Sequence, residues 1–304
     1  MKNLKQILAE ASEKKVAVGH FNFADLIGFK AIVEAAEELG VPVILGTSES
    51  EAKFVGREQA VALVKSLRNS GKEVFLNSDH TKSLEEVKKA VAAGYDAILF
   101  DGAHLDFEEN IRQTKVVVDY IKSYNAEILV EGEIGNIGTG SQLREELPHG
   151  AAIKPEDLTT PEQAARFVKE TGIDLLAPAV GNIHGMLARR SPQGEGGFAQ
   201  GYDYPLNIER IRAIHNALLQ AQGKAVPLVL HGGSGNTDED FVAAIDAGVV
   251  IVHISTEIRL AWREGLEKGL KDNPEEIAPY KVEPEAVAEM KHAVKTRLKV
   301  FNKL

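Results

Sequence analysis

The chain alternates between short apolar runs and longer segments in which apolar and polar positions recur with helical spacing. The runs consist mainly of Val, Ile, Leu and Ala, as expected for parallel strands that are covered on both faces. The segments between them, such as 26–40 and 83–96, place apolar residues three and four positions apart. Several of these segments end at a glycine, which is typical of a helix C-terminus. The predicted strands lie at residues 16–22, 41–48, 74–80, 97–103, 127–135, 175–185, 227–235 and 249–256.

Strand–helix alternation repeated along about 250 residues predicts an α/β fold of the (β/α)8 or TIM-barrel type. The alternative is an open doubly wound sheet, which would favour a G-x-G-x-x-G motif after the first strand, and "HFNFADLIG" (20–28) contains none. Helical patterns at 3–13 and 284–301 fall outside the repeat and predict extra terminal helices. No linker or low-complexity stretch interrupts the chain, so we expect residues 1–304 to form a single TIM-barrel domain.

Two connections are long, at about 136–162 and about 186–206, and both follow the carboxyl ends of predicted strands. A barrel builds its active site from the loops at that end. Loops of this length are usually functional or mobile. We therefore expect the chemistry of this protein on that face of the barrel.

Charge and cysteine content narrow the possible functions. The chain carries 45 acidic and 35 basic side chains, a formal net charge of −10, so any anionic ligand must be held by local groups. The absence of cysteine excludes disulfides, thiolate zinc sites and a cysteine nucleophile. The polar start of the chain lacks the apolar run of a signal peptide, and no later run is long enough to span a membrane. We expect a cytoplasmic protein that binds neither nucleic acid nor membrane.

Polar side chains gather at the carboxyl ends of the predicted strands, which a barrel brings to one face. His80, His184 and His231 lie on three different strands, with acidic residues nearby. Neutral imidazoles suit zinc, and three protein ligands leave one position for a substrate. The alternative for each histidine alone is a hydrogen-bonded packing residue, and for Asp79 alone it is a helix cap. The strand-end residues are Asn22, Ser48, Asp79, His80, Asp101, Glu131, Glu133, His184, His231, His253, Ser255 and Thr256.

Two of the last loops have the composition of an anion site. The stretch "HGGSG" (231–235) is a glycine-rich turn before a helix, and such a turn presents backbone N–H groups to an anion. The stretch "STE" (255–257) places two hydroxyl groups before the next helix. TIM barrels often bind phosphate after strands seven and eight. We favour phosphate over the alternative, an ordinary glycine turn with a Ser or Thr N-cap.

These residues resemble the class II, metal-dependent fructose-bisphosphate aldolases, a family that also includes tagatose-bisphosphate and other ketose-bisphosphate aldolases. The similarity covers nearly the whole predicted barrel, and the motifs follow in the same order. The matching stretches are "DH" (79–80), "DGAHLDFEENI" (101–111), "VEGEIG" (130–135), "AVGNIHG" (179–185), "PLVLHGGSG" (227–235) and "ISTE" (254–257).

The resemblance implies a catalytic zinc ion on three histidines. Glu133 would be an alternative or second-site ligand, and Asp101 would lie near it. A monovalent cation, K+ or Na+, would lie beside the substrate phosphate on the backbone carbonyls of Gly185 and Gly232. The implied metal residues are His80, His184, His231, Glu133 and Asp101. The implied substrate and phosphate residues are Asn22, Ser48, Gly185, Gly232, Gly233, Ser234, His253, Ser255 and Thr256.

The resemblance also implies the reaction. A ketose bisphosphate, with fructose 1,6-bisphosphate the leading candidate, would be cleaved reversibly to dihydroxyacetone phosphate and an aldehyde, glyceraldehyde 3-phosphate. Zinc would stabilise the enediolate as a Lewis acid. Asp79 would take the proton from the hydroxyl next to the scissile bond as the aldehyde leaves. No Schiff base is needed, and "LLAPAV" (175–180) contains no lysine. The family also implies a homodimer or a homotetramer.

Three positions depart from the family pattern. His253 stands where the family usually has an Asn that meets substrate hydroxyls or the enediolate. "NIGTGS" (136–141) replaces a Gly-Gly pair followed by acidic residues, one of which protonates the enediolate carbon. The nearest acids here are Glu145 and Glu146, which would have to reach in from the loop or are inert surface charges. Ala103 replaces a common Ser, a small packing change.

Several questions stay open at the level of the sequence. Arg189 and Arg190 would hold a second phosphate or be a solvated loop pair. A metal-dependent hydrolase would want His-x-His on the first strand, and "GHFN" (19–22) offers one histidine. A phosphosugar-binding protein that kept both sites and lost turnover is the alternative from another class. The sequence does not choose between fructose, tagatose and other bisphosphates.

Overall fold

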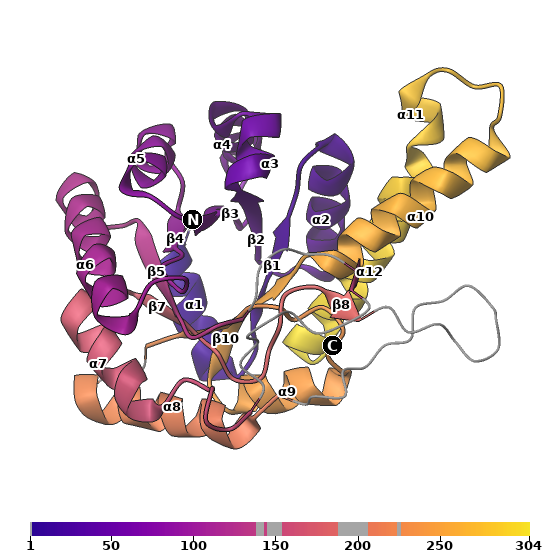
Figure 1. The fold of residues 1–304 in the computed structure, drawn as a ribbon. Coiled ribbons are helices and arrows are strands. Elements are labelled where there is room, and N and C mark those ends of the chain that lie inside the picture. Colours follow the sequence, from indigo (N-terminus) through magenta and orange to yellow (C-terminus); the bar gives the residue numbers. More distant parts are fainter. Residues whose placement is uncertain (1, 138–142, 145–153, 188–205, 224–225) are drawn as a thin grey trace.

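The computed structural model describes residues 2–137, 143–144, 154–187, 206–223 and 226–304, and in these residues eight parallel strands close into a barrel (Figure 1). Each of the predicted apolar runs supplies one strand, which confirms the (β/α)8 prediction. In the order in which they lie around the barrel, the strands are β1 (Val18–Asn22), β10 (Val249–Ile254), β9 (Leu228–Leu230), β7 (Leu175–Pro178), β5 (Leu129–Ile134), β4 (Ala97–Phe100), β3 (Val74–Thr81) and β2 (Val43–Ser48).

Helices surround the barrel, and α10 and α11 project beyond it (Figure 1). The predicted terminal helices are present as α1 and α12. Two helices follow β2, because Gly56, with a φ of 89°, separates them. The helices are α1 (Leu4–Lys14), α2 (Leu26–Leu39), α3 (Glu49–Val55), α4 (Arg57–Asn69), α5 (Leu84–Ala93), α6 (Phe107–Tyr124), α7 (Pro161–Thr171), α8 (Ile208–Gln222), α9 (Asp238–Asp246), α10 (Thr256–Asp272), α11 (Pro279–Val282) and α12 (Pro284–Asn302).

The helix ends follow the local sequence signals. Gly40, Gly94 and Gly172 are C-caps in the left-handed conformation, as the glycine pattern predicted. At α9 the cap is Ala247, and Gly248 follows it with a φ of 121°. These short stops let each helix turn back promptly into the next strand.

The first helix closes one end of the barrel. Leu4, Ile7, Leu8 and Ala11 of α1 belong to one apolar cluster with residues at the beginnings of the strands, among them Phe75. A separate and larger cluster fills the space between the barrel and its outer helices. Because α1 covers the amino ends of the strands with apolar side chains, the polar carboxyl ends are left for a ligand.

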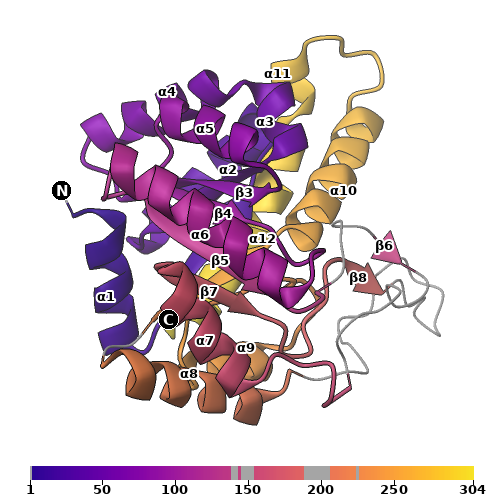
Figure 2. The same ribbon diagram turned by 60° about the vertical axis from the view of Figure 1, so that its left-hand side comes forward.

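A short two-stranded pair lies at the opposite end of the barrel from α1. Figure 2 shows β6 (Leu143–Arg144) and β8 (Met186–Leu187) on that side, and they pair in parallel within the two long connections. These two strands, one from each long connection, therefore lie at the end where the sequence predicted chemistry. Within the described ranges, no helix combines the length and the apolar composition needed to cross a membrane.

Arg297 joins the last helix to its neighbours through a buried ion pair. Its side chain is only 4% exposed and donates to Glu257 on α10 at 2.7 and 3.0 Å, and to Asp238 on α9 at 2.7 Å. Its guanidinium also lies 5.2 Å from the centre of the Phe241 ring. Since α10 begins at the end of β10, this contact fixes the start of that helix relative to the barrel.

We expect Arg297→Ala to lower the free energy of unfolding by about 3 kcal/mol, because it leaves the Glu257 carboxylate partly buried and unpaired. Denaturant titration followed by circular dichroism measures this change. Lys295→Ala is the matched control. Lys295 lies on α12, as Arg297 does, and forms an exposed ion pair with Glu38 of α2, so the loss of this pair should leave the midpoint nearly unchanged. Equal midpoints for the two variants would contradict a stabilising role of the buried pair.

Candidate active site

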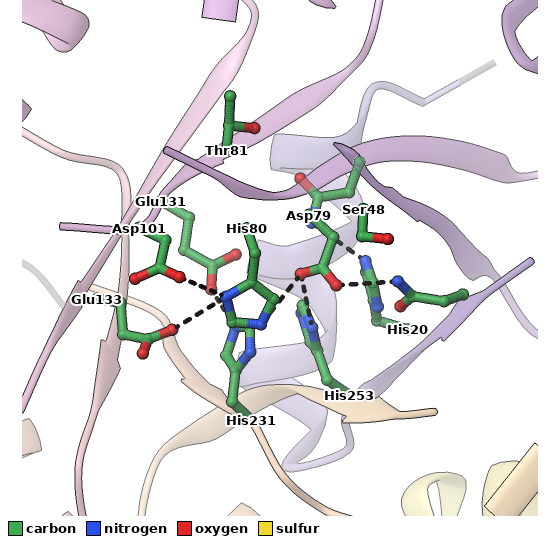
Figure 3. A network of polar contacts seen from close by, with 12 residues as sticks. His20, Ser48, Asp79, His80, Thr81, Asp101, Glu131, Glu133, His231 and His253 are labelled. Atoms are coloured by element: carbon green, nitrogen blue, oxygen red, sulfur yellow. Dashed lines mark hydrogen bonds and ion pairs between the residues drawn. The ribbon is translucent and has the colours of Figure 1, made fainter. Parts of the chain in front are cut away.

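Strand β3 is irregular where it reaches the polar end of the barrel. Its pairing with β4 shifts between Ser78 and Thr81, and His80 has a φ of 48°, a conformation that non-glycine residues rarely adopt. In a regular strand the side chains of Asp79 and His80 would point to opposite faces. Here both side chains line the same cavity, and Figure 3 shows them side by side. Backbone strain of this kind is concentrated at functional sites.

The cavity at the carboxyl ends of the strands has a volume of about 440 Å3. It is lined by the predicted site residues apart from Glu133 and Gly233. Glu49, Ser50, Lys53, Lys82 and Arg259 line it as well. The predicted residues that line it are Asn22, Ser48, Asp79, His80, Asp101, His184, Gly185, His231, Gly232, Ser234, His253, Ser255 and Thr256.

Three histidine rings meet in this cavity from β3 and from the segments after β7 and β9. The ring centres of His80 and His184 are 4.7 Å apart, those of His80 and His231 are 5.0 Å apart, and those of His184 and His231 are 5.5 Å apart. The planes are inclined by 70–75°, so the rings meet edge to face and do not stack. One donor atom from each ring and one from Glu133 all lie within 4.8 Å of one another. This is a compact set for one divalent cation.

Carboxylates behind two of the rings orient them. His80 Nδ1 lies 3.0 Å from Asp101 Oδ2, and His231 Nε2 lies 2.8 Å from Glu131 Oε1. In proteins, a carboxylate on one ring nitrogen directs the other nitrogen toward a metal. His231 Nδ1, His184 Nε2 and Glu133 Oε2 are buried and have no hydrogen-bond partner among the described residues. Three buried donors of the right chemistry are thus available to an ion, and the site fits a divalent metal.

Burial and charge shift the pKa values in this cluster. Burial opposes protonation of His80, but Asp79 and Asp101 outweigh it and raise the pKa of His80 to about 10. Burial, reinforced by Asp101, raises the pKa of Glu133 to about 7. Burial and then the nearby His80 hold the pKa of His184 well below its usual range. An incoming cation would therefore find a neutral imidazole at His184 and a carboxyl group at Glu133 whose ionised form it stabilises.

A second group of donors, His20, Asp79 and His253, is equally compact but is arranged differently. The rings of His20 and His253 lie face to face, 3.5 Å apart and within 4° of parallel. The lone pairs of two parallel rings run side by side and do not converge on one point. We therefore assign the cation to the first group.

Asp79 is held by a hydrogen-bond chain that the sequence analysis missed. Asn22 Nδ2 donates to Asp79 Oδ2 at 2.9 Å and to Glu51 Oε2 at 2.9 Å. Glu51 is buried, also accepts from the backbone and side chain of Ser48, and pairs with Arg259 at 2.5 Å. The available signal was the Ser-x-x-Glu capping box at Ser48 and Glu51, which starts α3. That carboxylate also reaches across to Asn22 of β1.

The turns after β9 and β10 meet at the other side of the cavity. Ser234 Oγ lies 3.4 Å from the Ser255 backbone nitrogen and 3.3 Å from that of Glu257, both of which donate to it. Thr256 is the first residue of α10, so the positive end of a 17-residue helix points at this region. Ser255 Oγ is buried without a hydrogen-bond partner among the described residues. The Ser255 and Thr256 hydroxyls, together with the positive end of the α10 dipole, form a suitable anion site.

Two glycines in the β9 turn allow close approach of backbone segments. Gly233 donates its N–H to the His253 carbonyl at 3.1 Å, which ties the ends of β9 and β10 together. Because this N–H is used within the protein, we leave Gly233 out of the proposed phosphate contacts. Gly232 has a φ of 58°, and a Cβ there would lie 2.2 Å from the Ile183 carbonyl oxygen. Glycine is therefore required where the His231 turn crosses the segment before His184.

Four residues that the sequence analysis considered are outside the described residues, so the structure does not test them. These are Glu145, Glu146, Arg189 and Arg190.

Comparison with known proteins gives a consistent result. The sequence profile of the family described as "Fructose-bisphosphate aldolase class-II" matches residues 2–304. A 6-phospho-5-dehydro-2-deoxy-D-gluconate aldolase of Bacillus licheniformis is 34% identical, over 98% of this chain and 94% of that protein. A fructose-bisphosphate aldolase of Geobacillus stearothermophilus is also 34% identical, over 92% of this chain and 89% of that protein. The crystal structure of the YdjI aldolase from Escherichia coli K12 superposes with a TM-score of 0.76 and 28% identity, covering 99% of this chain and 97% of that one.

We expect Gly232→Ala to destabilise the fold through its clash with the Ile183 carbonyl. Gly40→Ala is the matched control, because Gly40 has a similar φ of 65° and no atom within 4 Å of an added Cβ. Both variants strain the backbone, so the difference between them reports the clash, which should amount to about 1–3 kcal/mol. Thermal unfolding of the two variants measures it. Identical destabilisation would show that the turn can move away from Ile183 freely.

Proposed function

The chain belongs to the class II fructose-bisphosphate aldolase family, and from that premise we propose that it cleaves a ketose bisphosphate, with fructose 1,6-bisphosphate as the leading candidate. Members of this family are metal-dependent aldehyde-lyases that act on phosphorylated sugars. The products would be dihydroxyacetone phosphate and glyceraldehyde 3-phosphate, in a reversible reaction. The observation that carries the proposal is the set of buried, unpaired donors of His184, His231 and Glu133 beside Asp79.

We assign a zinc ion to His80, His184 and His231, with Glu133 as an alternative ligand and Asp101 as the carboxylate that orients His80. A divalent ion held there acts as a Lewis acid on the substrate oxygens and stabilises negative charge next to the bond that breaks. Glu131 holds the His231 ring so that its Nδ1 faces the ion site. The side chains thus bring a positive charge to the substrate in a protein whose net charge is −10.

Asp79 is our candidate for the acid/base group. Burial opposes its ionisation, but the neighbouring positive charge of His80 holds the pKa of Asp79 below its usual range, so it is a carboxylate at neutral pH. Asn22 occupies Oδ2, whereas Oδ1 has no hydrogen-bond partner among the described residues. Oδ1 is therefore the atom that accepts the hydroxyl proton in cleavage and returns it in condensation.

The phosphate of dihydroxyacetone phosphate would lie at the turns after β9 and β10. Ser234, Ser255 and Thr256 supply hydroxyls, and the N-terminus of α10 supplies a favourable dipole. A monovalent cation on the carbonyls of Gly185 and Gly232 would offset the second phosphate charge. Asn22, Ser48 and His253 would line the sugar part of the cavity.

A second candidate substrate comes from the relatives. The protein named 6-phospho-5-dehydro-2-deoxy-D-gluconate aldolase is as similar to this chain as the fructose-bisphosphate aldolase of Geobacillus stearothermophilus, at 34% identity each. An assay of several phosphorylated ketoses and acceptor aldehydes therefore tests the substrate. The homodimer or homotetramer stays a prediction.

We expect His80→Ala, His184→Ala and His231→Ala each to lose zinc and aldol cleavage together. The loss of metal affinity should exceed the roughly 10–100-fold typical of removing a residue that only supports a ligand. Mass spectrometry for metal content and a coupled cleavage assay measure the two quantities. A chelator should abolish cleavage by the wild-type protein, and added zinc should restore it.

His292→Ala is the matched control for this series, because His292 is exposed on α12. It should keep both metal and activity. Full zinc occupancy in all three site variants would overturn the ligand assignment. Phosphosugar binding without any cleavage by the zinc-loaded wild type would overturn the aldolase proposal in favour of a binding protein.

We expect Asp79→Asn to keep zinc and phosphate affinity, because neither depends on the negative charge of this residue. Cleavage should fall by about 10²–10⁴-fold, the range of one general acid/base group. Solvent exchange of the dihydroxyacetone phosphate C–H proton should fall less, since on this proposal another group serves that carbon. Loss of zinc in Asp79→Asn would instead make Asp79 a ligand or a structural support.

A further inference from the structure

The face-to-face pair of His20 and His253 is only partly explained by the function proposed above, which places His253 in the lining of the cavity and gives His20 no role. The two residues are register partners on the adjacent strands β1 and β10, so their side chains point to the same side of the sheet. Their ring centres are 3.5 Å apart and their planes are within 4° of parallel. The pair stands in the barrel interior next to Asp79 (Figure 3).

His20 is fixed from three directions. It is 1% exposed, and Asn77 Nδ2 donates to its Nε2 at 3.1 Å. A Cβ at Gly46 of β2 would lie 2.2 Å from His20 Cε1, so a glycine there makes room for the ring. Burial lowers the pKa of His20 to about 4 and holds that of His253 well below its usual range. Two neutral rings can stack without the repulsion that two imidazolium ions would suffer.

Only His253 of the pair lines the cavity. Its Nδ1 lies 3.6 Å from Asp79 Oδ1, and Figure 3 shows the Asp79 carboxylate between His80 and His253. His253 Nε2 is buried on the far side of the ring and has no hydrogen-bond partner among the described residues. The nitrogen nearer to the cavity therefore lies beside the oxygen that we assign to proton transfer. A substrate hydroxyl that reaches Asp79 Oδ1 also meets His253 Nδ1.

We propose that His20 is a positioning residue, which holds the His253 ring against Asp79 so that the two side chains together recognise the substrate hydroxyl next to the scissile bond. This inference rests on the function proposed above. The χ2 angle of a histidine has a broad distribution. An imidazole with no stacked neighbour can therefore rotate its nitrogen away from a partner. The ring of His253 lies between two others: its flat contact is with His20, and the His231 ring, 3.9 Å away and inclined by 37°, covers it less closely. The recognised chemistry is a polyol hydroxyl on the aldehyde half of the substrate.

The two half-reactions separate this role from a structural one. Exchange of the dihydroxyacetone phosphate proton needs only the phosphate half of the substrate, whereas cleavage of the ketose also needs the hydroxyl on the aldehyde half. We expect His20→Ala to lower kcat/KM for cleavage about tenfold relative to exchange, in line with the loss of one oriented hydrogen bond. Zinc content should match that of the wild type, because His20 is not in the four-donor set.

Two further variants separate the ring of His20 from its polar contact. His20→Phe keeps a flat ring against His253 and loses the hydrogen bond with Asn77, and His20→Asn keeps a polar group and loses the ring. The cleavage-to-exchange ratio should stay near the wild-type value in H20F and fall in H20N as in H20A. H20F keeps the core filled. If H20A does not fold, the comparison of H20F with H20N therefore still tests the role of the ring.

A double-mutant cycle with His253→Ala tests whether the pair acts as a unit. H20A should add little to H253A, because the ring that it positions is already absent. Additive effects, or equal ratios for H20F and H20N, would overturn the inference. A wild type that neither cleaves ketose bisphosphates nor exchanges the proton would refute the proposed function. A wild type that does both, with H20A at the wild-type ratio, would refute only the role of His20.

Discussion

The buried donor atoms of His184, His231 and Glu133 are the constraint on which the polar end of this barrel depends. An unpaired polar atom in a protein interior costs about 1–3 kcal/mol, so several of them side by side are unfavourable unless a cation completes them. The neighbouring features follow from this need. Asp101 and Glu131 turn two rings inward, and the irregular β3 backbone lets His80 and Asp79 face the same cavity.

The same cavity keeps its carboxylates apart from its anion site, although the net negative charge of the protein would disfavour binding an anion. The carboxylates next to the histidines come from β3, β5 and the end of β4. A bound metal would offset their negative charge. The anion site lies instead at β9 and β10, where it is built from hydroxyls, glycine turns and the N-terminus of α10. A substrate whose carbonyl carbon is next to the carbon that carries the phosphate fits this order. A protein with a net charge of −10 can thus hold an anion because the relevant field is local.

The sequence was sufficient for the barrel, because the strands begin as apolar runs and the segments between them have a helical period. It also placed His80, His184 and His231 together, since strand ends of a barrel share one face. It did not reveal the role of Glu51, whose capping box reads as a local helix start although its carboxylate reaches Asn22 on another strand. Nor did it reveal the contact of His20 with His253. Both residues stand in apolar runs, and only the register of β1 with β10 brings them together.

This register also explains why polar rings are tolerated so deep in the barrel. The amino ends of the strands and α1 form an apolar layer that is closed to water and supplies stability without any polar group. One layer higher, Gly46 removes a side chain from β2, the His20 imidazole fills the space that it leaves, and the His253 ring stacks on His20. Replacing either ring by a smaller amide would open a void next to Asp79, and a side chain at Gly46 would displace His20. Gly46, His20 and His253 therefore form one packing unit. Its stacked rings support the part of the cavity next to Asp79.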